Sequence, residues 1–318
     1  MPTIVNIRRA ALAVSLALLF AALIWFVVGG SRSHAEQKIP ETVTVLNDLA
    51  YGPPGVALDI YTPKIADIAK LSLPTVVWVH GGGWVGGSKK YVASYAAALA
   101  ASGYVVVAID YSLPPDSIYP TPVRQTFEAL AFLNKHAKLL HVDPTRLVLA
   151  GDSAGAQIAA QVVAAATSRA YAKQLAVTPT VSASQIKGTI LYSGAYDLAY
   201  LSFDDPIGEA KESPIATYAG NKNYRTDPKF ATFSVINYLT RAFPPTFLSA
   251  GNADPFEPQS LAFAARLKSK GVKVDEFFFP KDYKPALPHV FQFDLESDAA
   301  RFTLLRALLF LGSVTKPR

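Results

Sequence analysis

The stretch RLVLAGDSAGAQIAAQVVAAA, residues 146–166, decides the fold of this 318-residue chain. It begins as a short aliphatic run typical of a buried strand and ends as an alanine-rich pattern typical of a helix. Between the two lies the pentapeptide GDSAG, residues 151–155. Serine between two glycines at a strand-to-helix turn is the pattern of a nucleophile elbow, because the turn is too tight for side chains at its flanks. An ordinary helix N-cap is the simpler alternative for Ser153, but its place between a strand and a helix favours a catalytic hydroxyl.

A serine hydroxyl is a weak nucleophile at neutral pH and needs a general base, which itself needs an orienting acid. Only one histidine follows Ser153 in the chain, namely His289 in KPALPHVFQF, residues 284–293. This segment comes after the strand-like run VKVDEFFFP, residues 272–280. We therefore predict that His289 is the base, the alternative being a surface or packing histidine.

The orienting acid has two candidates at strand ends and a more remote third. Asp197 lies in YSGAYDL, residues 192–198, and Asp254 lies in SAGNADPFEP, residues 249–258. Asp254 follows one strand-like run and precedes a helix-like one, which favours it, whereas Asp197 is more simply interpreted as a cap for the segment after its strand. Glu257 is the third candidate. The sequence therefore favours Asp254 without excluding the other two.

A glycine-rich loop raises a different possibility. In VVWVHGGGWVGGSKK, residues 76–90, the glycines at 81, 83 and 86 have the spacing G-x-G-x-x-G, and Asp110 ends the next strand-like run. Strand, glycine loop, helix and a later acid make up a dinucleotide-binding fingerprint. However, Trp84 and Val85 interrupt this loop, and the first plausible helix cap, Ser88, comes only after all the glycines. We therefore predict no nucleotide cofactor, and Asp110 is interpreted as a structural residue at a strand end.

From residue 42 onward the chain alternates strand-like and helix-like segments, which predicts an α/β fold with a mostly parallel sheet and helices on both faces. TVTVLN and VALDIYTP, joined by GPPG, predict a hairpin at a sheet edge. Helices are expected at residues 89–102, 122–136, 153–168, 259–270 and 296–311. Residues 200–223 are polar and show no clear period, which indicates a small cap-like insertion. We expect one catalytic domain over residues 42–318.

The N-terminus carries a basic head, residues 1–9, and then an apolar segment, residues 10–30. As a helix, Ala10 to Val28 would span roughly 28 Å, close to the ~30 Å hydrocarbon core of a bilayer. This length favours an uncleaved anchor, while the small residues Ser33 and Ala35 are compatible with a cleaved signal peptide, and a buried helix is a third alternative. A linker, residues 31–41, follows. We expect a catalytic domain outside the cytoplasm, either anchored in the membrane or exported after cleavage.

Composition excludes several classes of function. The chain has no cysteine, so disulfides, thiolate nucleophiles and cysteine-containing metal sites are ruled out. Its five histidines show no helical zinc-site spacing, and we expect no metal. The net charge of +6 is not concentrated in any basic block, so we expect no nucleic-acid partner. A hydrophobic content of 51% fits a globular protein with a large core and an additional apolar segment.

Four motifs together resemble those of the α/β-hydrolase esterases related to hormone-sensitive lipase. They are HGGGW, GDSAG, ADPF and HVF, which begin at residues 80, 151, 253 and 289. The resemblance covers essentially residues 41–311 and implies an α/β-hydrolase fold. It also implies a nucleophile, base and acid at Ser153, His289 and Asp254, and an oxyanion hole made by the backbone amides of Gly82, Gly83 and Ala154. His80 is then a structural residue that tethers the glycine loop.

The chain enters its first hairpin almost at once, without the lid helices that many members of that family carry there. With LDIYTP and HGGGWVGGSK, it is more similar to a compact branch that contains feruloyl and acetyl-xylan esterases and kynurenine-formamidase-like enzymes. The resemblance implies a serine hydrolase that acts on small acyl esters. An arylformamidase-like amide hydrolase and a non-catalytic binding module are the alternatives. The expected partner is a small ester, and the sequence contains no sign of the oligomeric state.

Overall fold

The structure is a computed structural model that describes residues 39–201 and 213–316 of the chain. The expected basic head, the apolar segment at residues 10–30 and most of the expected linker lie outside the described residues, as does the middle of the expected cap-like insertion. In the described part of the chain, no helix is both long enough and apolar enough to cross a membrane.

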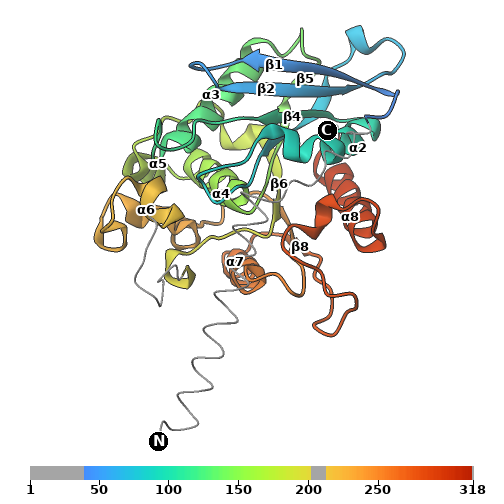
Figure 1. Cartoon of the computed structure of the whole chain (residues 1–318). Coiled ribbons are helices and arrows are strands. Elements are labelled where there is room, and N and C mark those ends of the chain that lie inside the picture. The colour runs from blue at the N-terminus through green and yellow to red at the C-terminus, as the bar shows by residue number, and fades with distance from the viewer. Residues whose placement is uncertain (1–38, 202–212, 317–318) are drawn as a thin grey trace, which may run out of the picture.

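Within the described residues, eight strands form one sheet in the order β1-β2-β4-β3-β5-β6-β7-β8 (Figure 1). β1 pairs antiparallel with β2, and β2 pairs antiparallel with β4, whereas the pairs from β4 through β3 to β8 are parallel. The mostly parallel sheet and the hairpin at its edge are thus confirmed. The strands are β1 (Val43–Ala50), β2 (Ala57–Pro63), β3 (Leu73–Val79), β4 (Val105–Ile109), β5 (Val142–Asp152), β6 (Ile186–Tyr192), β7 (Thr246–Ser249) and β8 (Val274–Glu276).

Helices cover both faces of this sheet, as predicted, and each face has its own apolar core (Figure 1). One core packs the sheet against α3, α4, α5 and α7, and the other packs it against α2 and α8. The helices are α2 (Ala93–Ala101), α3 (Thr121–Lys135), α4 (Ala154–Thr167), α5 (Arg169–Leu175), α6 (Pro214–Ala219), α7 (Glu257–Ser269) and α8 (Asp298–Val314). Because β3 and β4 are covered on both faces, their side chains are almost all apolar rather than alternating with polar ones.

Several of the described elements differ from the expectation from sequence, among them β8 and α5. The run at residues 272–280 forms only the three-residue strand β8, because Phe279 leaves the sheet to pack against Tyr283 and Phe291 in a small separate core. The short helix α5 was not expected, and it begins where the hydroxyl of Ser168 accepts a hydrogen bond from the amide of Tyr171. Both differences arise from contacts that a local sequence pattern does not contain.

Residues 213–233, which are the described end of the cap-like insertion and the turns after it, form a cap-like segment that packs into the main core of the molecule. α6 buries Ile215 and Tyr218, and the turns that follow it bury Phe230 and Phe233. α4 holds this segment through Gln157, whose side-chain amide donates to the backbone carbonyl of Phe233 at 3.0 Å. A buried amide that donates to a backbone carbonyl fixes the segment against the helix that follows Ser153.

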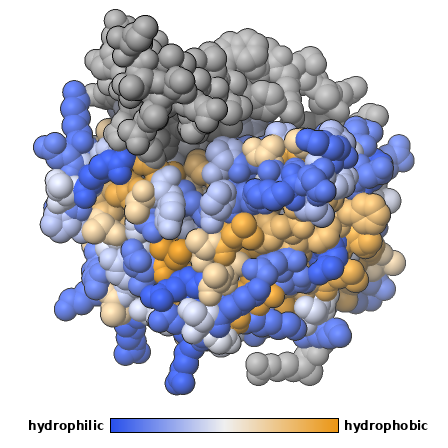
Figure 2. Space-filling view, turned by 90° about the horizontal axis from the view of Figure 1, so that it is seen from below, coloured by the Kyte–Doolittle hydropathy of each residue, from blue (hydrophilic) through white to orange (hydrophobic). Residues whose placement is uncertain are grey.

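Apolar side chains also reach the surface. Figure 2, which views the molecule from below, shows a band of hydrophobic residues between charged side chains. α8 exposes Phe302, Leu305 and Leu309, whereas Phe310 and Leu311 of the same helix are buried in the core. α8 therefore carries apolar side chains on its solvent side as well as on its core side.

Candidate active site

Ser153 sits on a strained turn between the end of β5 and the start of α4. Its backbone angles are φ 52° and ψ −120°, outside the regions that a serine normally occupies. Both flanking glycines are required by space. A Cβ on Gly151 would lie 2.6 Å from the backbone of Gly155, and a Cβ on Gly155 would lie 2.0 Å from the carbonyl oxygen of Val79. The turn thus presents the serine hydroxyl at the carboxyl edge of the sheet, as the GDSAG motif predicts.

Three predicted residues come together at this edge. Nε2 of His289 lies 2.9 Å from Oγ of Ser153, and Nδ1 of His289 lies 2.9 Å from Oδ1 of Asp254. They are supplied by the ends of β5, β7 and the loop after β8, which meet because parallel strands end at the same edge. The side chain of Asp254 is completely buried and that of His289 is only 10% exposed. This is the arrangement of a nucleophile, a base and an orienting acid.

The surroundings of His289 favour its protonated form. Burial by itself lowers the pKa of His289, but the charge and hydrogen bond of Asp254, together with the charge of Asp152, outweigh that effect and raise it. Oδ1 of Asp254 also accepts a hydrogen bond from the amide of Phe256 at 2.8 Å, which fixes the carboxylate. The ring of Phe256 then contacts the imidazole edge-on, with centroids 5.3 Å apart. The imidazole is therefore held in one orientation and can accept a proton from Ser153.

The two rival acids have other partners. Asp197 caps a short 3-10 helix, where its Oδ1 accepts hydrogen bonds from the amide of Ala199 at 3.0 Å and the hydroxyl of Ser234 at 3.1 Å. Glu257 forms an ion pair with Lys281. Neither carboxylate has a hydrogen bond to His289 among the contacts of the described residues. The acid beside His289 is therefore Asp254.

The glycine loop after β3 curls back on itself. The amides of Val85 and Gly86 both donate to the carbonyl oxygen of Gly82, at 3.2 and 3.0 Å. Gly82 and Gly83 have φ values of 132° and 61°, and a Cβ on Gly82 would lie 2.1 Å from the carbonyl oxygen of Gly86. No helix starts within these glycines, since the 3-10 turn and α2 begin only after Ser88. The loop therefore lacks the helix N-terminus that a dinucleotide phosphate requires.

This loop lies directly beside the elbow. A Cβ on Gly81 would come within 3.1 Å of Cβ of Ser153. Ala154 is the first residue of α4, so its amide has no partner within the helix. The predicted oxyanion donors Gly82, Gly83 and Ala154 thus belong to two segments that meet at Ser153.

His80 and Asp110 support the far side of the loop. His80 is 2% exposed; its Nδ1 lies 2.6 Å from the carbonyl oxygen of Gly81, and its ring stacks on Tyr111 with centroids 4.3 Å apart. Burial lowers the pKa of His80, which favours a neutral ring. Asp110 accepts a hydrogen bond from the amide of Lys89 at 2.6 Å, at the end of the loop. Both residues are structural supports of the loop.

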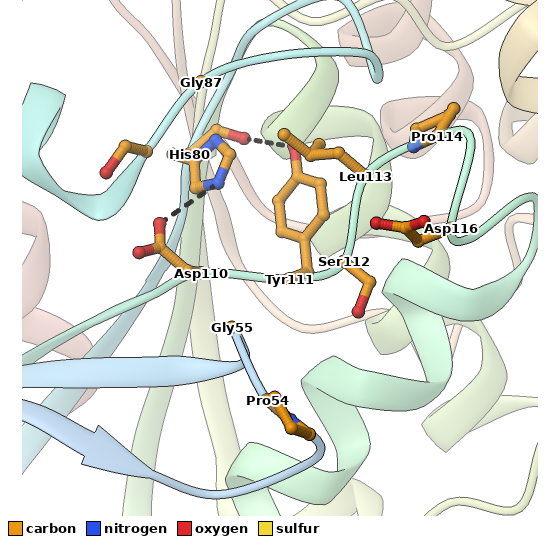
Figure 3. Close-up of a pocket in the computed structure, with 11 residues that line it drawn as sticks. Pro54, Gly55, His80, Gly87, Asp110, Tyr111, Ser112, Leu113, Pro114 and Asp116 are labelled. Carbon is orange, nitrogen blue, oxygen red and sulfur yellow. Dashed lines mark hydrogen bonds and ion pairs between the residues drawn. The ribbon is translucent and has the colours of Figure 1, made fainter.

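A pocket of about 350 Å³ opens behind the glycine loop (Figure 3). His80, Gly87, Asp110 and Tyr111 lie along it, together with the tip of the β1–β2 hairpin. Ser153 is not among its lining residues. Among the described residues, no three histidine, aspartate or glutamate side chains lie together as ligands of a metal ion would.

Trp84, which belongs to the glycine loop, is buried among aromatic side chains. It is 2% exposed and packs against Tyr218 and Phe233, with ring centroids 6.0 and 5.2 Å away. Its indole N–H donates to Oε1 of Gln157 on α4 at 3.1 Å. The cap-like segment and the glycine loop thus form one packed aromatic wall against α4, the helix that begins directly after Ser153.

Gly82→Ala is expected to lower kcat by about 10²-fold, because its Cβ would overlap the carbonyl of Gly86 and displace the predicted oxyanion donors. Gly83→Ala is the matched control. A Cβ on Gly83 meets no atom within 4 Å, and its φ of 61° costs an alanine only about 1–2 kcal/mol. Steady-state kinetics on a soluble ester compare the two variants. Equal losses of kcat would contradict a specific role for the curl at Gly82.

Comparisons with known proteins bear on the family and the fold. A model of the alpha/beta hydrolase fold family matches residues 76–292. An esterase of Gibberella moniliformis is 29% identical over 70% of this chain and 68% of its own. Carboxylesterase NlhH of Mycobacterium tuberculosis is 28% identical over 69% of this chain and 67% of its own. The solved structure of esterase B from Lactobacillus rhamnosis, inhibited with a tributyrin phosphonate, has the same fold, with a TM-score of 0.76 at 24% identity over 96% of this chain and 95% of that one.

Proposed function

The chain belongs to the alpha/beta hydrolase fold family, whose model covers residues 76–292, and on this premise we propose that it is a serine carboxylic-ester hydrolase for small acyl esters. The observation that carries the proposal is the hydrogen-bonded chain from Ser153 through His289 to Asp254. Relatives named esterase and carboxylesterase support the reaction class. The expected partner is a small ester.

Catalysis follows from the contacts of these residues. Nε2 of His289 takes the proton of Ser153 as Oγ attacks the ester carbonyl, and Asp254 stabilises the imidazolium that forms. The amides of Gly82, Gly83 and Ala154 are proposed to bind the oxyanion of the tetrahedral intermediate, and each such donor is worth about 10²–10³-fold in rate. The imidazolium then gives its proton to the leaving alcohol, and water releases the acyl group by the same route in reverse.

The packed wall beneath the glycine loop supports a preference for short acyl groups. Trp84, Tyr218 and Phe233 are all almost completely buried and fill the space there with aromatic rings. This wall is close-packed. A long acyl chain that extends from Ser153 toward the wall would therefore have to displace buried side chains. A short acyl group would not.

A panel of p-nitrophenyl esters with two to sixteen acyl carbons tests this proposal. Formanilide, a formylanilide, is assayed with them to test the amide-hydrolase alternative. We expect kcat/KM to be highest for acetate or butyrate and to fall by about tenfold or more at eight carbons. Hydrolysis of the formylanilide faster than of every ester would favour the amide-hydrolase alternative. A maximum at sixteen carbons would contradict the preference for small esters, and no turnover of any member would contradict the reaction class.

We propose further that the apolar segment from Ala10 to Val28 places the enzyme in a membrane, with its catalytic domain outside the cytoplasm. Its length as a helix, roughly 28 Å, supports an anchor rather than a shorter signal peptide. Esterase activity that stays in washed membranes after alkaline extraction is the expected result. Activity found only in the extracytoplasmic soluble fraction would indicate cleavage instead.

A further inference from the structure

Asp152, the second residue of the GDSAG motif, has a buried carboxylate that joins two parts of the site. Its Oδ2 accepts a hydrogen bond from the backbone amide of Gly81 at 3.1 Å, and its Oδ1 accepts one from the indole N–H of Trp78 at 2.9 Å. The residue is only 7% exposed. Gly81 starts the glycine loop, while Asp152 itself precedes Ser153, so a single side chain links the loop to the elbow.

The contact between Asp152 and Gly81 leaves no room for a side chain at residue 81. A Cβ on Gly81 would lie 2.4 Å from Oδ2 of Asp152 and 2.9 Å from its carbonyl oxygen. The other end of the loop is fixed separately, where Asp110 accepts from the amide of Lys89 at 2.6 Å. The loop is thus held by one carboxylate at each end. Asp152 holds the end of the loop at Gly81. Gly81 directly precedes Gly82, whose amide is a predicted oxyanion donor.

The charge of Asp152 also acts on the base, because Asp152 directly precedes Ser153, whose Oγ lies 2.9 Å from Nε2 of His289. It is a cause of the raised pKa of His289, after Asp254, and His289 in turn lowers the pKa of Asp152. Burial is the larger effect on Asp152 and raises its pKa to about 6. Asp152 is therefore ionised above about pH 6, where it favours the imidazolium, and is protonated below it, where this support is lost.

We propose that Asp152 is a positioning residue for the esterase reaction, which holds the start of the oxyanion loop through Gly81 and supports the imidazolium of His289 by its charge. This inference rests on the proposed function. The two roles use different properties of one carboxylate, namely its lone pairs and its charge. They can therefore be separated by substitution.

Asp152→Asn keeps the shape of the side chain and removes the charge. The amide has one oxygen, so it can accept from Gly81 or from Trp78, and its NH2 group must then face the other N–H. We expect kcat/KM to fall by about 10- to 100-fold. The affinity for a trifluoromethyl ketone, whose adduct with Ser153 places an oxyanion in the hole, should fall by a similar factor. The acid limb of the pH profile should move to lower pH, because loss of the carboxylate lowers the pKa of His289.

The double variant Trp78→Phe/Asp152→Asn separates the two roles. Without the indole N–H, the side-chain oxygen of the new asparagine is free to accept from Gly81, so the ketone affinity should return to within about threefold of Trp78→Phe alone. The acid limb should stay displaced, because the charge is still missing. Trp78→Phe alone is the matched control, since it keeps the carboxylate and its bond to Gly81, and its ketone affinity should equal that of the wild type. Because the indole N–H helps to lower the pKa of Asp152, the acid limb of the double variant is compared with that of Trp78→Phe rather than with that of the wild type.

An NMR titration of the His289 imidazole in wild type and Asp152→Asn needs no turnover, so it tests the charge effect even if ester hydrolysis is not the reaction. Absence of ester hydrolysis by the wild type would contradict the proposed function alone. Wild-type ketone affinity together with an unchanged pKa of His289 in Asp152→Asn would overturn this inference alone. If Asp152→Asn does not fold, Asp152→Glu, which keeps the charge but moves it, should keep the acid limb near that of the wild type. If the acid limb of Asp152→Glu moved to lower pH by as much as is expected for Asp152→Asn, this result would count against the charge effect.

Discussion

Ser153→Ala is expected to lower kcat for a short p-nitrophenyl ester by about 10⁵- to 10⁶-fold. The variant has no hydroxyl for His289 to activate, so neither an acyl-enzyme nor an enzyme phosphonate can form. Turnover is measured spectrophotometrically, and phosphonate labelling by intact mass. We expect the mass of the variant to be unchanged after incubation with a p-nitrophenyl phosphonate, whereas the wild type gains one phosphonyl group.

The matched control for this prediction is Ser168→Ala, which removes a hydroxyl at the other end of α4. Ser168 accepts a hydrogen bond from the amide of Tyr171 at the start of α5 and lies outside the site. Its loss should cost about 1 kcal/mol of stability and leave labelling intact. Normal phosphonate labelling of Ser153→Ala would show that another residue is the nucleophile and would refute the proposed mechanism.

Asp254→Asn is expected to lower kcat at neutral pH by about 10⁴-fold. An asparagine that donates through its amide favours the imidazole tautomer with the proton on Nε2, which faces Oγ of Ser153 and cannot accept its proton. The acid limb of kcat should move to lower pH, because the charge and hydrogen bond of Asp254 help to raise the pKa of His289. A pH series of kcat, with KM measured at each point, checks both effects.

Asp197→Asn is the matched control, because Asp197 was the rival acid in the sequence and caps a short helix in the structure. We expect it to retain kcat within about threefold and to lose about 1 kcal/mol of stability or less, since asparagine caps nearly as well as aspartate. A loss of kcat equal to that of Asp254→Asn would mean that the hydrogen bond at 2.9 Å between Asp254 and His289 does not orient the base.

Much of the fold was predictable, because the signals that specify it are local. The alanine-rich pattern after GDSAG became α4, and the alternating runs joined by GPPG became the edge hairpin of β1 and β2. Periodicity and turn residues are read within a few positions, so such elements follow from the sequence. β8 was predicted too long, because its end depends on Phe279 packing against the loop that carries His289. That contact lies outside any local window.

The site divides in the same way. Ser153 was identified by its own motif, and His289 was identified because it is the only histidine that follows Ser153 in the chain. The sequence favoured Asp254 over Asp197 without excluding it, and the structure places Asp254 beside His289, which is a property of the strand order. Asp152 was not singled out, although it stands inside the motif, because only the folded chain brings Gly81 and Trp78 to its carboxylate.

By itself, the sequence determined the α/β architecture, the strained serine turn and the choice of His289 as the predicted base, since backbone conformation and hydrophobic periodicity depend on neighbouring residues. Only the tertiary structure decided which of the candidate acids lies beside His289, how His289 meets Ser153, and that the carboxylate of Asp152 holds the glycine loop against the elbow. These contacts join residues 35 to 136 positions apart. Their geometry is set by how parallel strands are ordered in the sheet, and that order is a property of the whole core.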